Sequence, residues 1–332
     1  MGYGARKREI EKKGKLIKRV LLGILLFFII GLCTFSHFYP PASWKYYVSK
    51  PKIASRKSGE LRVHFLDVGQ GDSTIIEFPD GKVALIDGGE GSGSAKRSVL
   101  RTLNALKIKT IDYLIVTHSD ADHCGALEEV LKYKKVLNAY LPTAFLVSGS
   151  AYADFYADVI KEAECYFPSR GTDLSNASGE YPYAFTFVLP YQYNVDNEEV
   201  WESNASAALW LDYQGASALL AGDAPVSDLE DLIEDAKNGY MQRYGVELSS
   251  TEILKVSHHG SLSGTNRNIL EYLQPQTAVI SCGAGNIYGH PHTEVLHLLY
   301  EFGVDTYRTD SQENIMLTIR KNGEYAVSTY AK

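Results

Sequence analysis

Residues 114–123 pass from an apolar run into a cluster of polar side chains that can bind a metal. Residues 113–116 are aromatic, aliphatic or β-branched, which is typical of a buried strand. Residues 124–131 have the spacing of an amphipathic helix with its two glutamates outward. The polar cluster is therefore expected in a loop that joins a strand to a helix.

Four side chains of this loop can point at one centre: His118, Asp120, Asp122 and His123. Imidazole and carboxylate together favour zinc, manganese or iron over calcium. The aspartates are also good helix N-caps. Capping explains one or two of these residues, but not two histidines interleaved with two aspartates. The loop therefore predicts a metal site.

Charge is unevenly distributed along the chain. Residues 1–19 carry eight Lys or Arg against two Glu, a net charge of +6, and the formal charge of −7 then leaves −13 for residues 20–332. Nucleic-acid affinity comes mainly from phosphate neutralisation, so an acidic body argues against a long nucleic-acid track. The composition, 45% hydrophobic and 22% charged, is globular. The four cysteines indicate neither a disulfide framework nor a zinc ribbon.

Residues 20–39 are uncharged and mostly apolar, with the length of a bilayer span. The positive-inside tendency places the basic segment, 1–19, in the cytoplasm and the body outside. The alternative is a cleaved signal peptide, which would make the protein secreted. We favour an uncleaved, single-pass plasma-membrane anchor because no clean A-x-A site follows. Residues 40–59 are interpreted as a linker and 60–332 as one domain.

The body opens with strand-like segments at 61–67, 73–78 and 83–86, and a helix is expected over 95–106. Residues 148–183 are rich in tyrosine and poorly patterned, so we interpret them as an irregular insertion over the rim of the site. Aromatic side chains such as Tyr152 and Tyr183 can stack a sugar, a base or a choline-like cation. Alternatively, they pack the insertion itself.

The second half of the chain places further polar side chains where strands are expected to end. Asp223 follows a strand at 217–221, His258 and His259 end one at 252–257, and His290 lies in the loop after 276–282. One such residue would be unremarkable. Their recurrence at consecutive strand ends, together with the cluster at 118–123, predicts a shared centre.

Several motifs of the body occur in a fixed order: F-L-D-V-G-Q-G-D-S, L-I-D-G-G, T-H-S-D-A-D-H, H-H-G-S and N-x-Y-G-H-P. H-x-D-x-D-H resembles the H-x-H-x-D-H signature of the metallo-β-lactamase superfamily, with Asp120 where the second histidine usually stands. The whole set closely resembles the extracellular domain of ComEC-type DNA-uptake proteins. This resemblance implies an α/β fold, the four-layer αββα sandwich, here preceded by one transmembrane helix.

The resemblance also implies a centre of two divalent metal ions, zinc or manganese. The expected ligands are His118 and Asp120 for one ion, Asp122, His123 and His290 for the other, and Asp223 as the bridge. The carboxylate of Asp120 in place of an imidazole makes the first site harder and shifts its preference toward manganese. It stays open whether both sites are filled.

No histidine lies between His123 and Asp223, although the superfamily usually supplies a ligand there. Asn204 stands near that place, so either His258 or His259 fills the gap. The other is expected in catalysis, either as general acid or as a hydrogen-bond donor to the phosphate. Asp67 and Asp87 are expected to orient ligand imidazoles.

These features predict a membrane-anchored, extracellular, metal-dependent hydrolase of ester bonds. The preferred activity is that of a phosphodiesterase or nuclease using a hydroxide bridged by two metals, with DNA or a cell-envelope polymer as substrate. One alternative is a phosphodiesterase for a phosphocholine-decorated teichoic acid. Others are a lactonase or β-lactamase-type acyl hydrolase and a non-enzymatic metal-binding module.

Overall fold

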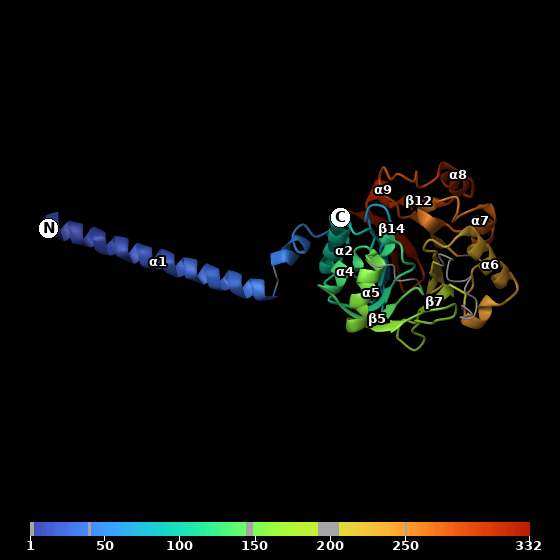
Figure 1. Cartoon of the computed structure of the whole chain (residues 1–332), viewed down its shortest axis with the longest axis horizontal. Helices are drawn as coiled ribbons and strands as arrows, with labels where there is room; N and C mark the ends of the chain where they lie inside the picture. Colours follow the sequence, from blue (N-terminus) through green and yellow to red (C-terminus); the bar gives the residue numbers. More distant parts are fainter. Residues whose placement is uncertain (1–2, 39–40, 144–148, 192–205, 250) are drawn as a thin grey trace. The chain divides into compact units, whose positions relative to one another are not determined.

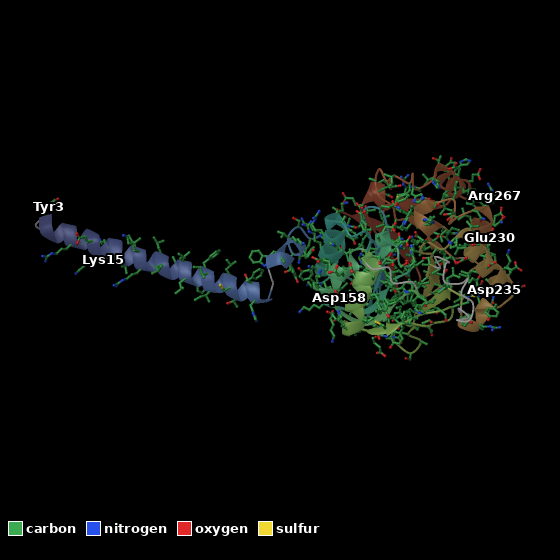
Figure 2. The ribbon with its side chains drawn as sticks, in the orientation of Figure 1. Tyr3, Lys15, Asp158, Glu230, Asp235 and Arg267 are labelled. Atoms are coloured by element: carbon green, nitrogen blue, oxygen red, sulfur yellow. The ribbon has the colours of Figure 1, made fainter. Side chains whose placement is uncertain are left out.

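The computed structural model describes residues 3–38, 41–143, 149–191, 206–249 and 251–332. The chain divides into two compact units, Met1–Val48 and Ser49–Lys332 (Figure 1). In the first unit a single helix, α1 (Tyr3–Phe38), contains both the basic and the apolar segment, and a 3₁₀ helix follows at Pro41–Tyr46. An 18-residue window within Glu11–His37 has a mean hydropathy of 2.4. Figure 2 shows side chains such as that of Lys15 projecting from α1. By its length and apolar composition, α1 is a candidate membrane span.

The second unit contains two β-sheets within its described residues. In spatial order, the first sheet consists of β14 (Tyr325–Tyr330), β13 (Asn314–Ile319), β1 (Leu61–Phe65), β2 (Thr74–Glu77), β3 (Val83–Ile86), β4 (Thr110–Ile115), β5 (Lys135–Tyr140) and β6 (Glu164–Tyr166). The second consists of β12 (Asp305–Arg308), β11 (Thr277–Ile280), β10 (Ile253–Lys255), β9 (Ala216–Leu220), β8 (Ala208–Tyr213) and β7 (Ala184–Leu189).

Helices cover the outer face of each sheet (Figure 1). On the side of the first sheet lie α2 (Gly93–Ala105), α3 (Ala121–Cys124), α4 (Leu127–Leu131) and α5 (Ala151–Glu162). On the side of the second lie α6 (Val226–Lys237), α7 (Arg267–Leu273) and α8 (Thr293–Glu301), and the short α9 (Thr309–Gln312) precedes β13. Further 3₁₀ helices occupy Met241–Tyr244 and Ser257–Gly260. The order helix, sheet, sheet, helix confirms the predicted fold class.

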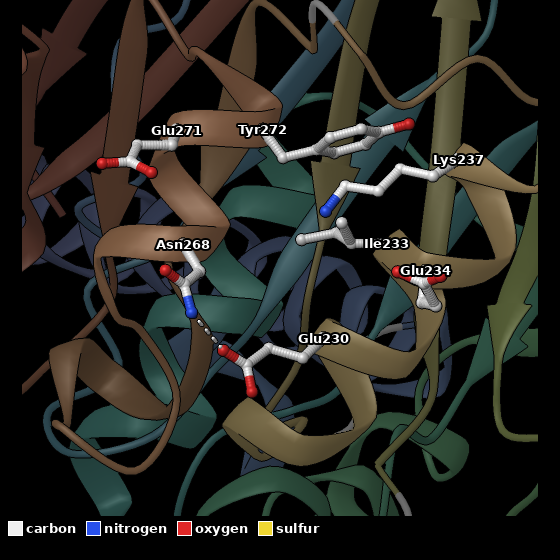
Figure 3. Close-up of a pocket in the computed structure, with 7 residues that line it drawn as sticks. All are labelled: Glu230, Ile233, Glu234, Lys237, Asn268, Glu271 and Tyr272. Atoms are coloured by element: carbon white, nitrogen blue, oxygen red, sulfur yellow. Dashed lines mark hydrogen bonds between the residues drawn. The ribbon is translucent and has the colours of Figure 1, made fainter.

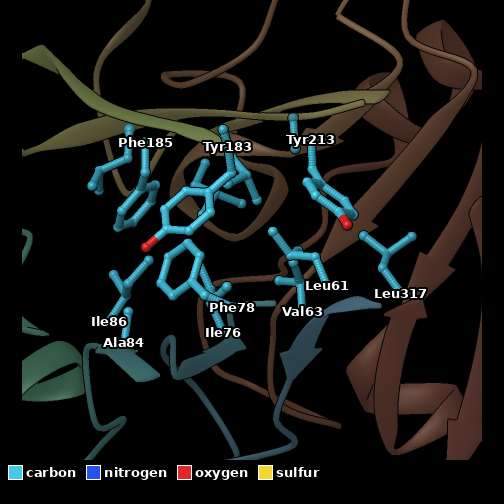
Figure 4. Packing of buried hydrophobic residues seen from close by; sticks show 14 of the residues in the cluster. Leu61, Val63, Ile76, Phe78, Ala84, Ile86, Tyr183, Phe185, Tyr213 and Leu317 are labelled. Carbon is cyan, nitrogen blue, oxygen red and sulfur yellow. The ribbon is translucent and has the colours of Figure 1, made fainter. Parts of the chain in front are cut away.

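The main core lies between the two sheets. Leu61 and Val63 of β1 face Tyr213 and Phe185 of the second sheet, and Figure 4 shows these side chains meeting between the two layers. All of them are buried, and burial of apolar side chains is the main favourable contribution to folding. The packed sheets thus form a rigid base for the loops at their edges.

The hairpin between β8 and β9 turns through Gln214 and Gly215, as the sequence predicts. Both residues have positive φ values, 59° and 87°, which is the conformation of a type I′ hairpin turn. The two strands are antiparallel, with Tyr213 opposite Ala216. This turn directs β9 toward the edge of the sheet where Asp223 follows.

The expectation of an irregular insertion at 148–183 is wrong for residues 151–166, which contain α5 and β6, whereas residues 167–183 contain no helix or strand. Ser150 caps α5 by accepting a hydrogen bond from the N–H of Ala153 at 3.1 Å. Tyr152, Phe155 and Val159 recur at helical spacing and are buried. These aromatic side chains therefore pack inside the protein instead of covering the rim of the site.

The single helix expected at 124–131 is also wrong, because the structure has two short helices there. α3 ends at Cys124 and α4 begins at Leu127. Gly125 between them packs so closely against another loop that a Cβ atom would lie 2.3 Å from the backbone nitrogen of Gly91. The close approach of these two loops interrupts the helix.

Candidate metal centre

The polar side chains predicted to share a centre lie where strands of both sheets end. β9, β10 and β11 run parallel to one another, and so do β3 and β4. Parallel strands bring their carboxyl ends to one edge of a sheet. Asp223 follows β9, His258 and His259 follow β10, and His118 follows β4.

Four histidines surround the carboxylate of Asp223. Its Oδ2 lies 3.3 Å from Nε2 of His123 and 3.3 Å from Nε2 of His259. The same oxygen lies 3.8 Å from Nε2 of His258 and 3.9 Å from Nε2 of His118. Asp223 is thus the centre of the cluster, at the place where the sequence predicts a bridging carboxylate.

Two further aspartates face these imidazoles. Oδ2 of Asp122 lies 3.3 Å from Nε2 of His259, and Oδ2 of Asp120 lies 3.7 Å from Nε2 of His118. The structure therefore brings together five of the six expected ligands, together with both histidines of the H-H-G-S segment. The oxygen-rich side is the more exposed one, since the Asp120 side chain is 55% exposed.

The sixth expected ligand, His290, lies at the edge of the cluster. Its ring centroid is 5.7 Å from that of His258 and 6.0 Å from that of His259. Burial and the neighbouring histidines lower the pKa of His290 to about 4, so its imidazole is neutral at pH 7. The sequence predicts His290 as the ligand that joins Asp122 and His123, but the imidazole beside Asp122 in the structure is that of His259.

The cluster fits divalent metal ions by the chemistry of its inward-facing atoms. Nε2 of His123, Nε2 of His259 and Oδ1 of Asp223 are buried and have no hydrogen-bond partner among the described residues. Buried polar atoms without a partner are costly and rare in folded proteins. Ligand atoms of Asp72, His123, Asp223 and His259 also lie within 4.8 Å of one another. Nitrogen and carboxylate oxygen are donors that zinc and manganese both accept.

Asp87 fixes the orientation of one of these imidazoles. Its Oδ2 lies 2.8 Å from Nδ1 of His123 and accepts a hydrogen bond from the hydroxyl of Thr117 at 2.7 Å. Its Oδ1 accepts one from the N–H of Thr117 at 2.8 Å. Burial lowers the pKa of His123, but the carboxylates of Asp223 and Asp87 outweigh it and raise that pKa well above its usual value. Nδ1 is thereby engaged, and Nε2 is left to face Asp223.

Lys255 and Asp72 form a buried ion pair behind His259 that the sequence motifs do not predict. Lys255, inside β10, pairs with Oδ2 of Asp72 and donates to the carbonyl of Gly222 at 3.1 Å. Oδ1 of Asp72 lies 3.4 Å from Nδ1 of His259, which is also 3.0 Å from the carbonyl of Ser281. Burial raises the pKa of Asp72, but Lys255 and His259 outweigh it and lower that pKa to about 2. A lysine within the apolar run I-L-K-V is the signal that could have revealed this pair.

The glycine-rich loop of the D-V-G-Q-G-D motif packs directly on the metal loop. Gly71 has a φ of 118°, and a Cβ atom there would lie 1.9 Å from the carbonyl oxygen of Asp122. The N–H of the next residue, Asp72, donates to the same carbonyl at 3.2 Å. Only glycine permits this approach, so the motif positions Asp122.

The two adjacent histidines of H-H-G-S differ sharply in environment. The side chain of His259 is 2% exposed and that of His258 is 41% exposed. Both have a left-handed backbone, with φ of 50° for His258 and 56° for His259. Such residues cost about 1–3 kcal/mol each and cluster at functional sites. The turn buries one imidazole in the cluster and leaves the other at the surface.

The remaining predicted residues are Asp67 and Asn204. The carboxylate of Asp67 accepts from the N–H of Gly69 at 3.1 Å and from Nζ of Lys332 at 2.6 Å. Asp67 therefore bonds to Lys332 and does not lie at an imidazole of the cluster. The aspartate that lies beside such an imidazole, that of His259, is Asp72. Asn204 lies outside the described residues.

A pocket between α6 and α7 lies apart from this cluster (Figure 3). Asn268 donates to the carboxylate of Glu230 at 3.0 Å, and Nζ of Lys237 lies 5.5 Å from the ring centre of Tyr272. Its polar side chains thus satisfy one another. None of the residues predicted for the metal centre lines this pocket.

Two packed sheets covered by helices, with histidines and aspartates gathered at the strand ends, define a hydrolase fold with a candidate metal site. The chain belongs to the metallo-β-lactamase superfamily, whose family model matches residues 66–284. This confirms the superfamily that the H-x-D-x-D-H segment indicates.

Curated relatives confirm the resemblance to ComEC-type proteins. ComE operon protein 3 of Bacillus subtilis (strain 168) is 30% identical over 277 residues, which is 78% of this chain and 33% of that protein. Competence protein ComA of Neisseria gonorrhoeae is 26% identical over 264 residues, or 80% of this chain and 33% of the relative. Recombination protein 2 of Haemophilus influenzae is 29% identical and covers 73% of this chain and 26% of the relative. The chain spans a third or less of the length of these proteins.

The comparison with solved structures finds similar chains of low sequence identity. The metallo-β-lactamase fold protein YhfI from Bacillus subtilis has a TM-score of 0.44 and 12% identity, covering 76% of this chain and 98% of its own. Zn(2+)-bound PqqB from Methylobacterium extorquens has a TM-score of 0.44 and 10% identity, covering 74% of this chain and 97% of its own.

Proposed function

We propose that this chain is a membrane-anchored, metal-dependent phosphodiesterase whose body lies outside the cell. The observation that carries the proposal is the gathering of His118, His123, His258 and His259 around the carboxylate of Asp223. A buried carboxylate between imidazoles with unpartnered nitrogens is suited to stand between two cations.

Each residue is assigned to an ion according to the side chains that lie nearest to it. His118 and Asp120 would hold one ion, Asp122, His123 and His259 the other, and Asp223 would contact both. When bound, the two ions supply a nucleophile at neutral pH and stabilise the charge that develops on the phosphorus centre. Which of zinc and manganese is bound is part of the proposal to be tested, because the donor set accepts both.

His258 is proposed as the proton donor to the leaving oxygen. Its Nδ1 lies 2.9 Å from the hydroxyl of Ser263, which orients the ring. Its Nε2 faces Asp223 at 3.8 Å and the side chain is open to solvent. This nitrogen can hold a proton beside the reacting centre, as a general acid requires.

A nucleic-acid strand is the preferred substrate. The names of two curated relatives refer to competence and to recombination, which favours DNA over an envelope polymer. The teichoic-acid alternative depends on exposed aromatic side chains in the tyrosine-rich segment. Of these, Tyr152, Phe155 and Tyr183 are buried, whereas Tyr166 and Phe167 are exposed. The acidic body supports a short footprint on the strand.

The outward orientation rests on α1. Its first part carries the basic residues of segment 1–19, and the uncharged, mostly apolar residues 20–38 follow in the same helix. Basic residues stay in the cytoplasm, so the unit Ser49–Lys332 would lie on the other side of the membrane.

The proposal is tested by metal content and substrate class together. The full-length chain in detergent is analysed by mass spectrometry for bound metal, and then assayed with bis(p-nitrophenyl) phosphate and with a generic lactone. We expect bound zinc or manganese and turnover of the diester. Asp223→Asn should lose metal and turnover together, while Glu230→Gln, in the pocket of Figure 3, should keep both. Turnover of the lactone alone would indicate an acyl hydrolase, and bound metal without either activity would indicate a binding module.

A further inference from the structure

Three apolar side chains are exposed beside the candidate metal centre. Ile287 is 91% exposed, Tyr288 59% and Leu262 47%. Leu262 directly follows the H-H-G-S turn, and the other two lie in the loop that leads to His290. Exposed apolar groups gathered at a site mark a surface that a ligand can cover.

The loop that carries Ile287 and Tyr288 is held in shape by the side chain of Asn286. Its Nδ2 donates to the carbonyl of Gly283 at 2.9 Å. Its Oδ1 accepts from the N–H groups of Tyr288 at 3.1 Å and of His290 at 3.0 Å. Because the loop is already ordered, a ligand that binds there loses less free energy to conformational ordering.

The two loops that carry these side chains are tied together. The N–H of Leu262 donates to Nδ1 of His292 at 3.0 Å, and the N–H of His292 donates to the carbonyl of Gly260 at 3.0 Å. The H-H-G-S turn and the loop after β11 therefore present their exposed side chains as one surface.

Tyr288 is linked to the proposed proton donor through the ring of His290. Its ring stacks on the ring of His290, with centroids 5.7 Å apart and planes at 22°. The ring of His290 in turn lies 5.7 Å from that of His258. A group that stacks on the exposed part of Tyr288 would therefore be separated from His258 by one ring, that of His290.

The charge of the chain limits the ways in which a nucleic-acid strand can be held. Residues 20–332 carry a net charge of −13, so many simultaneous phosphate contacts are disfavoured. Stacking of bases on aromatic rings does not depend on phosphate neutralisation and tolerates any base. An acidic nuclease can thus gain affinity from stacking where basic grooves would use charge.

We propose that Tyr288, which follows the exposed Ile287 in the chain, is a subsite on which an unpaired nucleobase stacks at the rim of the metal centre. The substrate is then a single strand or a strand end, because the bases of an intact duplex are covered by their neighbours. This inference rests on the proposed phosphodiesterase function. A choline-like cation is a poorer occupant, since recognition of quaternary ammonium groups uses several aromatic walls and this surface has one tyrosine beside two aliphatic side chains.

The test measures binding, so that it does not depend on turnover. The full-length chain in detergent is titrated with a fluorescent thymidine tetranucleotide with slowly hydrolysed phosphorothioate linkages, and with an abasic tetramer of the same linkages. We expect the wild type to prefer the base-bearing strand by at least about fivefold. Tyr288→Ala and Tyr288→Leu should abolish this preference, and Tyr288→Phe should retain it. Tyr300→Ala, a matched control at a tyrosine that is 82% exposed on α8, should change nothing.

Salt dependence provides a second readout. If stacking dominates and only one or two phosphates are neutralised, raising the salt from about 50 to about 200 mM should weaken binding less than about tenfold. A much steeper dependence that persists in Tyr288→Ala would overturn the subsite, because charge would then hold the strand.

The remaining outcomes separate this inference from the proposed function. Equal affinity for base-bearing and abasic strands would remove the subsite and leave a phosphodiesterase intact. Tyrosine-dependent binding without hydrolysis of any diester would support the subsite and remove the proposed activity. If Tyr288→Ala weakens binding of a phosphocholine-bearing teichoic acid but not of the tetranucleotide, the surface serves the envelope polymer and the inference is wrong.

Discussion

Lys255 and Asp72 form a buried ion pair at the back of the metal centre, with side chains that are 3% and 6% exposed. The two residues are 183 positions apart in the sequence. Lys255 ends β10 of the second sheet and Asp72 lies in the loop before β2 of the first, so their contact ties the two halves of the fold together. Asp72 also faces Nδ1 of His259 at 3.4 Å. The pair therefore joins the stability of the fold to the position of an imidazole that we assign to the metal.

Removing the lysine should destabilise the protein and weaken metal binding at once. Lys255→Met removes the lysine partner of the buried Asp72 carboxylate, and breaking a buried ion pair in this way costs about 3–5 kcal/mol. Thermal unfolding of the full-length chain and its metal affinity would measure the two effects. Lys134→Met is the matched control, because that buried lysine binds the neutral groups of Asn104 and Ile108. An equal loss of metal affinity in both variants would contradict a specific role for the pair.

Much of the site could be predicted because its residues follow apolar runs. The cluster His118 to His123 comes directly after β4, and Asp223 follows β9 across a two-residue gap. A strand that ends in polar, metal-capable residues is recognisable without knowing what lies next to it. The helix at Gly93–Ala105 is recognisable from the spacing of its apolar residues, and the strand at Val83–Ile86 from its short apolar run.

Other features depend on contacts that sequence patterns do not contain. His258 and His259 are adjacent and identical in type, and only the left-handed turn buries one and exposes the other. The pairing of Asp72 with Lys255 is formed by two distant segments. The helix α5 was missed because its buried face uses Tyr152 and Phe155, and tyrosine is as common on surfaces as in cores.

Asp87 should affect the metal through His123 without contacting the metal itself. Asp87→Asn replaces the carboxylate that lies 2.8 Å from Nδ1 of His123, and loss of such a partner lowers metal affinity by about 10–100-fold. Competition with a chelator would measure the change. Asp67→Asn is the control, since Asp67 bonds to Gly69 and Lys332, and it should leave the affinity unchanged. If the two variants behave alike, the contact between Asp87 and His123 does not position the ligand.

Gly71 should tolerate no side chain. In Gly71→Ala the new methyl group would meet the carbonyl of Asp122 at 1.9 Å, whereas at Gly81, which also has a positive φ, nothing lies within 4 Å. Gly81→Ala should therefore show only the backbone strain of about 1–3 kcal/mol, and Gly71→Ala a larger loss together with a loss of bound metal. The midpoint of thermal unfolding and the metal content separate the two. Equal behaviour would mean that the loop can move away from Asp122.

The orientation of the chain can be tested on intact cells. The basic segment before the apolar stretch of α1 predicts that an added protease digests the unit Ser49–Lys332 and spares a tag placed before residue 1. Permeabilised cells, in which both ends are accessible, provide the control. Full protection of the body in intact, surface-accessible cells would contradict the outward orientation, and recovery of the body in the medium would indicate cleavage instead of anchoring.

His258 and His259 should differ in kind when each is replaced by alanine. His259 is buried between Asp122 and Asp223, so His259→Ala should lose metal and activity together. His258 is exposed and oriented by Ser263, so His258→Ala should keep the metal and slow hydrolysis of an alkyl diester by about 10²–10⁴-fold. An aryl diester has a better leaving group and needs less protonation as it departs. His258→Ala should therefore retain far more activity on the aryl than on the alkyl substrate. If both variants keep their metal and hydrolyse the alkyl diester at the wild-type rate, neither histidine acts in catalysis, and the metal-binding module becomes the better description.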